Sequence, residues 1–166
     1  MKKTYHVAQV NISRILAPLD DPWMEDFVAS LDEINALADN SPGFVWRLQT
    51  EEGNATYIRP YDDDRILFNL SVWESVEHLR AYVYYTAHMD IMRKKRRWFA
   101  KFDGMSFAIW WVTPGSIPTV SEAKDRLAYL QSHGESSQAF TFKNIFQPDE
   151  SAAEKFKALL NPCHAS

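Results

Sequence analysis

The stretch from residue 65 to residue 102 constrains the fold of this chain more than any other. Its first apolar residues recur at every second position, as in a β-strand: Ile66, Phe68, Leu70 and Val72. Ser75 then carries a side chain that can cap the start of a helix, and the residues after it have helical spacing. We therefore expect a strand that leads directly into a long helix over residues 76–102.

Three further strands are predicted by alternating apolar residues, at 5–13, 44–49 and 105–113. A first helix follows Asp21-Pro22 and ends at the Asn-Ser-Pro-Gly segment of residues 40–43. The resulting order, β-α-β-β-α-β, predicts an α+β fold, the ferredoxin-like antiparallel sheet with its helices on one face. Helices at 119–133 and 151–160 follow, so we expect a main domain over residues 1–147 and a C-terminal helical extension over 148–166.

Both faces of the expected strands carry apolar side chains, which indicates that both faces of the sheet are covered. Two helices can cover only one face. We therefore expect a homodimer in which a second copy of the sheet covers the other.

Composition excludes several classes of function. The net charge of −4 argues against a nucleic-acid-binding protein, and the single Cys163 excludes an intrachain disulfide or a thiolate metal site. The five histidines have no metal-ligand spacing, and no glycine-rich phosphate loop occurs. No apolar run is long enough for a membrane span, and no apolar segment follows Met1-Lys2-Lys3 as in a signal peptide. We expect a cytoplasmic protein without metal or membrane partner.

The aromatic content of 14%, with six Trp, is typical of a thick core, a cavity lined by aromatic rings or an oligomer interface.

Three polar residues lie among apolar neighbours in the middle of expected strands: Asn11, Arg47 and Asn69. A buried polar group without a hydrogen bond costs about 1–3 kcal/mol. These side chains therefore either satisfy one another in a structural network or contact a ligand, and the sequence leaves both interpretations open.

His88 is a candidate general base, proton shuttle or axial ligand, or else a helix residue without a special role. The basic run at residues 93–97 follows it. This run is either a solvated helix face or, with Trp98 and Phe99, a site for an anionic ligand such as a carboxylate.

Five segments carry a resemblance to known families: residues 6–22, 41–55, 66–84, 88–99 and 110–127. Together they resemble a bacterial family known only as domain of unknown function 3291. More broadly, the chain resembles the dimeric α+β barrel superfamily, which includes antibiotic-biosynthesis monooxygenases, haem-degrading monooxygenases and ligand-binding or stress-response proteins. The superfamily's characteristic strand-to-helix positions fall on Trp73, Tyr82 and His88, and Asn11 resembles an asparagine of the haem-degrading members. Those members carry Trp at the position of Tyr82, and their spacing to the later histidine is longer.

The resemblance implies a dimeric α+β barrel and a monooxygenase-like enzyme that acts on a small hydrophobic or aromatic molecule without a cofactor. The expected pocket lies between the helix 76–102 and the sheet. Its catalytic residues would be His88, Asn11 and Tyr82; its substrate-binding residues would be Arg47, Asn69, Trp73, Trp98 and Trp110. Two alternatives stay open: a haem protein with His88 as ligand, and a non-catalytic ligand-binding or stress-response dimer. The sequence names no substrate.

Overall fold

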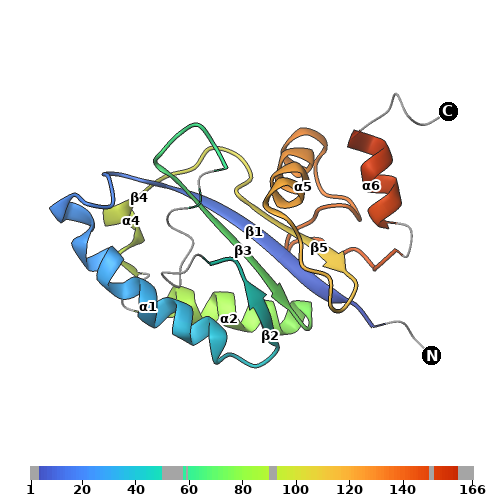
Figure 1. The fold of residues 1–166 in the computed structure, drawn as a ribbon, viewed down its shortest axis with the longest axis horizontal. Helices are drawn as coiled ribbons and strands as arrows, with labels where there is room; N and C mark the ends of the chain where they lie inside the picture. Colours follow the sequence, from blue (N-terminus) through green and yellow to red (C-terminus); the bar gives the residue numbers. More distant parts are fainter. Residues whose placement is uncertain (1–3, 50–57, 59, 90–92, 150–151, 161–166) are drawn as a thin grey trace.

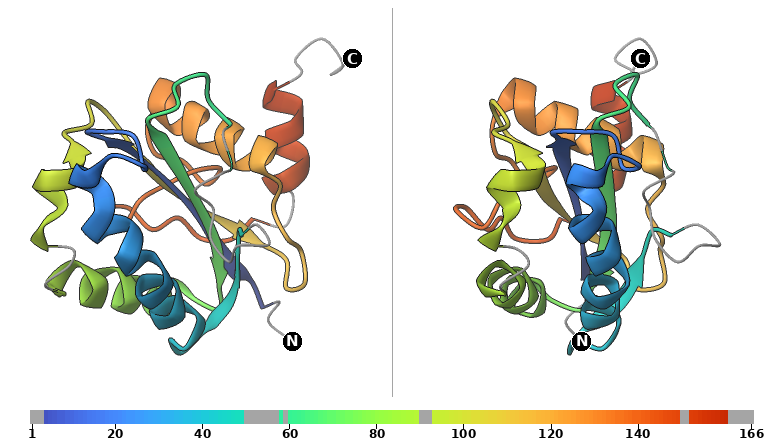
Figure 2. Two further views of the ribbon diagram at one scale, coloured as in Figure 1. Left: turned by 60° about the vertical axis from the view of Figure 1, so that its left-hand side comes forward. Right: turned by 90° about the vertical axis from the view of Figure 1, so that its left-hand side faces the viewer.

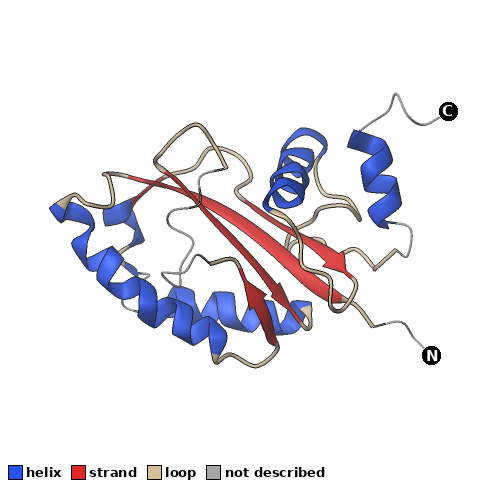
Figure 3. Cartoon of the chain, in the orientation of Figure 1, coloured by secondary structure: helices blue, strands red, loops and turns tan. Residues whose placement is uncertain are grey.

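The computed structural model describes residues 4–49, 58, 60–89, 93–149 and 152–160. Figures 1 and 3 show a sheet with helices on both sides. The strands are β1 (His6–Ile15), β2 (Phe44–Arg47), β3 (Ile66–Trp73), β4 (Phe99–Ala100) and β5 (Phe107–Val112). The helices are η1 (Pro22–Met24), α1 (Glu25–Asp39), α2 (Val76–His88), α4 (Lys95–Trp98), α5 (Val120–His133) and α6 (Ala152–Leu160).

The sheet is antiparallel and is centred on β1. One edge of β1 pairs with β3 along its length, and β2 continues the sheet beyond β3. The other edge of β1 pairs first with β5 and then, at Arg14 and Ile15, with the short β4. This strand arrangement confirms the predicted α+β, ferredoxin-like fold.

Helices α1 and α2 lie on one side of the sheet, as predicted (Figure 2). The predicted caps are in place: the side chain of Asp21 accepts a hydrogen bond from the backbone N–H of Trp23, and that of Ser75 accepts one from His78. Because Ser75 fixes the start of α2 two residues after β3, Val76 and Leu79 are buried against Trp73. The strand-to-helix junction expected from residues 66–76 is therefore confirmed.

The opposite face of the sheet is covered by a helix of the same chain. Ala123, Leu127 and Leu130 of α5 are buried against the second set of strand residues. That set consists of Ala8, Val10, Ile12, Phe68, Leu70, Val72, Ala108, Trp110 and Val112. We expected a second copy of the sheet on this face, but α5 of the same chain buries it. The homodimer stays a prediction that no longer has this support.

Helix α6 packs on the outer side of α5, through one aromatic side chain. Phe156 is 3% exposed, and the guanidinium carbon of Arg126 lies 3.8 Å from the centre of its ring. Arg126 is itself buried and donates hydrogen bonds to the backbone and side-chain oxygens of Gln138. Burial lowers the pKa of Arg126 from its ordinary value. The predicted C-terminal helix is present, and the domain boundary at residue 147 stays a prediction.

The prediction of a single helix over residues 76–102 was wrong. Helix α2 ends at His88, because Met89 adopts an extended backbone with ψ of 145°. The chain later forms the separate short helix α4, whose Trp98 is buried with Ile15, Met24 and Phe27. Burial of Trp98 against the far end of β1 requires the chain to leave the axis of α2.

A substitution at Gly43 is expected to destabilise the turn between α1 and β2. Gly43 has φ of +80°, and a Cβ added there would lie 2.2 Å from Cγ of His78. Gly115 has a similar φ of +89° with no atom within 4 Å, and it provides the matched control. Gly115→Ala should cost about 1–2 kcal/mol from backbone strain alone. Gly43→Ala should cost about 1–3 kcal/mol more from overpacking. Urea unfolding measures both, and equal losses would contradict the predicted clash.

Candidate binding site

A cavity of about 490 Å³ lies between α1, α2 and the sheet. Its floor comes from β1 and β3, and its walls from the two helices and the segment 99–107. Apolar side chains form most of the surface. The polar lining residues are Gln9, Asn11, Ser13, Asn35, Asn69, Ser71, Tyr82, Thr86 and Ser106. Among the described residues, no Asp, Glu, His, Lys, Arg or Cys lines the cavity. A charged molecule would lose its hydration there without an opposite charge in return.

Asn11 and Asn69 lie directly opposite each other on neighbouring strands, and both line the cavity. Asn69 is exposed although it lies in the middle of β3, because α1 and α2 leave the sheet open above it. Asn11 is half-buried. Two of the three polar strand residues expected at a pocket are therefore together at its floor.

Gln9 joins these two asparagines and was missed by the sequence reasoning. It is 3% exposed, and its Nε2 donates to Oδ1 of Asn69 at 2.8 Å and to Oγ of Ser71 at 2.7 Å. Nδ2 of Asn11 donates to Oε1 of Gln9 at 3.0 Å, and a longer contact of 3.4 Å joins Nδ2 of Asn11 to Oδ1 of Asn69. The sequence could have indicated this role. Side chains alternate between the two faces of a strand, so Gln9 lies on the same face as Asn11.

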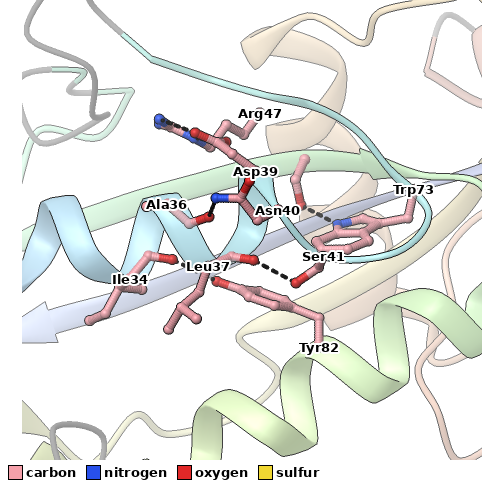
Figure 4. A network of polar contacts seen from close by, with 10 residues as sticks. Ile34, Ala36, Leu37, Asp39, Asn40, Ser41, Arg47, Trp73 and Tyr82 are labelled. Atoms are coloured by element: carbon pink, nitrogen blue, oxygen red, sulfur yellow. Dashed lines mark hydrogen bonds and ion pairs between the residues drawn. The ribbon is translucent and has the colours of Figure 1, made fainter.

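Figure 4 shows Trp73 beside Tyr82, which lines the cavity. Nε1 of the buried Trp73 donates to Oγ of Ser71 at 2.9 Å. The ring of Tyr82 stacks on Trp73 with centroids 4.9 Å apart, and its hydroxyl donates to the carbonyl oxygen of Ile34 at 3.4 Å. Tyr82 lines the cavity, whereas Trp73 supports that wall from behind. Burial raises the pKa of Tyr82 above its ordinary value.

Arg47 does not line the cavity. Its Nε and Nη2 lie 2.8 and 3.3 Å from the two carboxylate oxygens of Asp39, so it connects β2 to the end of α1 (Figure 4). Its side chain is 11% exposed. The geometry therefore supports the structural interpretation of Arg47 rather than a contact with a ligand.

Three other predicted site residues lie elsewhere. His88 is exposed in the last turn of α2 and is not among the lining residues, because helical rotation turns it away from Tyr82 and Thr86. Trp98 is buried against Phe27 in the separate core at the end of β1. Trp110 lies on the opposite face of the sheet, under α5. The geometry thus gives no support for His88 as base, or for these two tryptophans as pocket walls.

The cationic run is a solvated surface where it is described. Arg93, Lys94, Arg96 and Arg97 are all exposed. Arg97 lies over the ring of Trp23, with 5.8 Å from the guanidinium carbon to the ring centre. Phe99, which follows the run, lines the cavity. The expected anionic site therefore finds no support among these side chains.

The cavity does not fit haem. No histidine, cysteine or methionine is present among its described lining residues, and His88 lies outside it. In the described part of the chain, no three His, Cys, Asp or Glu side chains gather as metal ligands would. None of the described helices has both the length and the apolar character to cross a membrane.

The raised pKa of Tyr82 predicts a loss of stability at high pH. Its pKa exceeds the ordinary value of 10.0 only in the folded chain, so the unfolded chain releases its proton first. The contribution of Tyr82 to the free energy of unfolding is complete below about pH 10 and is lost as the pH rises through the pKa of the folded state. Tyr82→Phe should therefore make the decline in urea midpoint between pH 9 and 11 shallower. Tyr85→Phe, at a ring that is 63% exposed, should leave that decline unchanged.

A family model described as "Domain of unknown function (DUF3291)" matches residues 6–156. The chain belongs to this family. The match includes β1, from which Gln9 and Asn11 come, and reaches Phe156 in α6. The family expected from the five segments is therefore confirmed, and the match continues past residue 147 to residue 156. No curated protein matches this DUF3291 chain.

Solved structures with partial similarity include a cofactor-independent oxygenase. SnoaB, a cofactor-independent oxygenase from Streptomyces nogalater, is 18% identical over 70% of this chain and 97% of its own, with a TM-score of 0.41. An asparagine-to-alanine mutant of SnoaB is 17% identical over 68% and 95%, with a TM-score of 0.42. A Chloroflexus aurantiacus protein, provisionally named an antibiotic biosynthesis monooxygenase, is 15% identical over 69% and 98%, with a TM-score of 0.40.

Proposed function

We propose that this DUF3291 protein binds a small, uncharged, largely apolar molecule in the cavity between α1, α2 and the sheet. One observation carries the proposal: Asn69 is exposed in the middle of a strand, opposite Asn11, at the floor of a cavity whose walls are mostly apolar. Binding sites for small molecules are typically apolar hollows with a few convergent polar groups. A purely structural amide network would be covered by the helices.

We further propose that the bound molecule is oxidised by molecular oxygen without a cofactor, as the sequence resemblance implies. A suitable substrate carries an acidic CH2 group beside a carbonyl. Loss of a proton to water gives an enolate. Because no cationic side chain is among the described residues that line the cavity, its charge is stabilised only by hydrogen bonds to its oxygen, from the amide of Asn69 and the hydroxyl of Ser71. The enolate carbon then forms a bond to O2, and the protonated hydroperoxide loses water to leave a ketone. In balance, the CH2 group and one molecule of O2 become a carbonyl group and one molecule of water, and the substrate supplies all the electrons.

No described lining residue is a general base, so the substrate itself must be acidic enough to lose its proton. The same observation supports a second candidate function, in which the cavity binds its ligand without catalysis. The two functions predict the same occupant of the cavity and differ only in oxygen consumption.

Anthrone, a planar ketone with an acidic CH2 group, tests both functions. We expect saturable quenching of tryptophan fluorescence on binding, then consumption of one O2 per anthrone and formation of anthraquinone, faster than in buffer alone. Binding of anthrone without faster oxidation would exclude the oxygenase activity and support binding without catalysis. Absence of binding by anthrone and by a range of other neutral tricyclic aromatics would overturn both.

A further inference from the structure

The amides at the cavity floor specify the hydrogen-bonding pattern of the ligand. We propose that the molecule recognised there presents one donor and one acceptor side by side on a single edge, as a lactam does. This inference rests on the proposed binding function alone, not on the oxygenase activity, and adds the chemical class of the ligand. It follows from an account of every hydrogen bond made by Gln9, Asn11, Asn69 and Ser71.

Gln9 uses its whole side chain within the network. Both protons of its Nε2 are donated, to Asn69 and Ser71, and its Oε1 accepts from Asn11. Oγ of Ser71 accepts from Gln9 and also from Nε1 of Trp73. Two amide groups then have no partner among the described residues: Oδ1 of Asn11, an acceptor, and Nδ2 of Asn69, a donor. In this direction of the network the hydroxyl proton of Ser71 is a further donor. Both side chains line the cavity.

The network can also run in the opposite direction without losing a bond. If the three amides turn by 180°, Oε1 of Gln9 accepts from Asn69 and from the hydroxyl of Ser71, while its Nε2 donates to Asn11. Ser71 still accepts the hydrogen bond from Trp73, whose indole N–H can only donate. The unpartnered groups become Nδ2 of Asn11 and Oδ1 of Asn69. In either direction, this asparagine pair offers the cavity one donor and one acceptor.

The spacing of the pair suits adjacent groups on a ligand. Opposite residues of an antiparallel pair have Cβ atoms about 4.5–5.5 Å apart, so both amides can contact one edge of a ring. A lactam satisfies both groups at once. An edge with two acceptors, as in an ortho-quinone, would leave the free amide oxygen of the pair facing another oxygen. An unpaired buried polar group of this kind weakens binding by roughly tenfold or more.

The rest of the cavity selects a neutral, flat molecule of about three rings. Apolar side chains face the amides across the cavity: Phe27, Phe99 and the aliphatic residues of α1. The volume of about 490 Å³ is within the usual range for small-molecule sites. No described lining residue could balance the charge of a carboxylate or an amine.

Three probes of nearly the same shape test the inference. Phenanthridin-6(5H)-one is a planar tricyclic lactam, its N-methyl derivative keeps the carbonyl but lacks the donor, and phenanthrene lacks both groups. Isothermal titration calorimetry or tryptophan quenching gives the Kd of each. We expect the lactam to bind about tenfold more tightly than the N-methyl derivative, which is the contribution of one net hydrogen bond.

Two variants assign this preference to the amide pair. With the hydrogen bonds in the direction described first, Asn11→Leu removes the acceptor of the ligand N–H and should reduce the tenfold ratio to nearly one. Asn69→Leu removes the donor to the carbonyl, which both ligands carry, and should weaken both by a similar factor; the two roles exchange if the network runs in the opposite direction. Asn35→Leu provides the control, because Asn35 lines the cavity from α1 but has no bond to the pair. It should change both Kd values by the same factor and keep the ratio. Circular dichroism confirms that each variant is folded.

The outcomes separate this inference from the function on which it rests. Equal Kd values for the lactam and its N-methyl derivative would overturn the donor–acceptor inference while leaving the cavity as a binding site. A tenfold ratio that persists in both asparagine variants would also overturn it, since the preference would then come from another part of the chain. Failure of all three probes to bind, together with failure of anthrone, would overturn the proposed function itself.

Discussion

Trp73→Ala is expected to lower the free energy of unfolding by about 3–5 kcal/mol. The side chain is completely buried, lies edge-on to Phe44 with ring centroids 5.5 Å apart, and is stacked on Tyr82. Its removal leaves a cavity between β3 and α2 and also removes a hydrogen-bond donor from Ser71. Chemical unfolding followed by far-ultraviolet circular dichroism measures the loss without relying on tryptophan fluorescence.

Two further substitutions separate the causes of this effect. Trp73→Phe keeps most of the ring and removes the N–H, and it should cost about 1–2 kcal/mol less than the alanine variant. Trp23→Ala removes an indole that is 55% exposed, and it should change stability by under about 1 kcal/mol. Similar losses of unfolding free energy in Trp73→Ala and Trp23→Ala would contradict the close packing of Trp73 in the core.

Asn69→Leu is expected to reduce the rate of anthrone oxidation by about 10²–10³-fold if the proposed oxygenase activity is present. Loss of one donor to a developing oxyanion has an effect of this size in enzymes. The donor matters more in the transition state than in the bound ketone, so kcat should fall more than KM rises. Initial rates of oxygen consumption over a range of anthrone concentrations measure the two constants separately.

A second asparagine provides the control for this rate effect. Asn40→Leu removes an amide that donates to the carbonyl oxygen of Ala36 at the end of α1, outside the cavity. Its oxidation rate should equal that of the unmodified protein. A rise in KM with unchanged kcat in Asn69→Leu would show that the amide binds anthrone without assisting its oxidation.

Residues with strong local signals lie where the sequence places them in the fold. Asn11 and Asn69 were found because each interrupts an alternating apolar strand, and strand alternation is a local property of the chain. Ser75 was found because helix capping depends on residues within one turn. Tyr82 lies on the helix face that Leu79 and Thr86 define, and all three line the cavity.

Predictions that required distances between remote residues were less successful. Gln9 and Ser71 were missed, because their role depends on the register that brings β1 beside β3, about 60 residues along the chain. Trp110 was expected as a wall of the pocket, but both faces of its strand are apolar, so alternation alone does not show which face the pocket takes. Which face meets α2 and which meets α5 is decided by packing of the whole chain.

The sequence by itself determined the order of the four long strands and the helices α1, α2, α5 and α6, the position of the caps and the two asparagines at the centre of the sheet. These features depend on steric and hydrogen-bonding preferences among residues that are close in the chain. Only the tertiary structure decided that α5 covers the second face, that α2 ends at His88, and that the cavity has no charged residue among its described lining residues. Each of these depends on side chains that meet from distant segments, because close packing in a core is a property of all its members together.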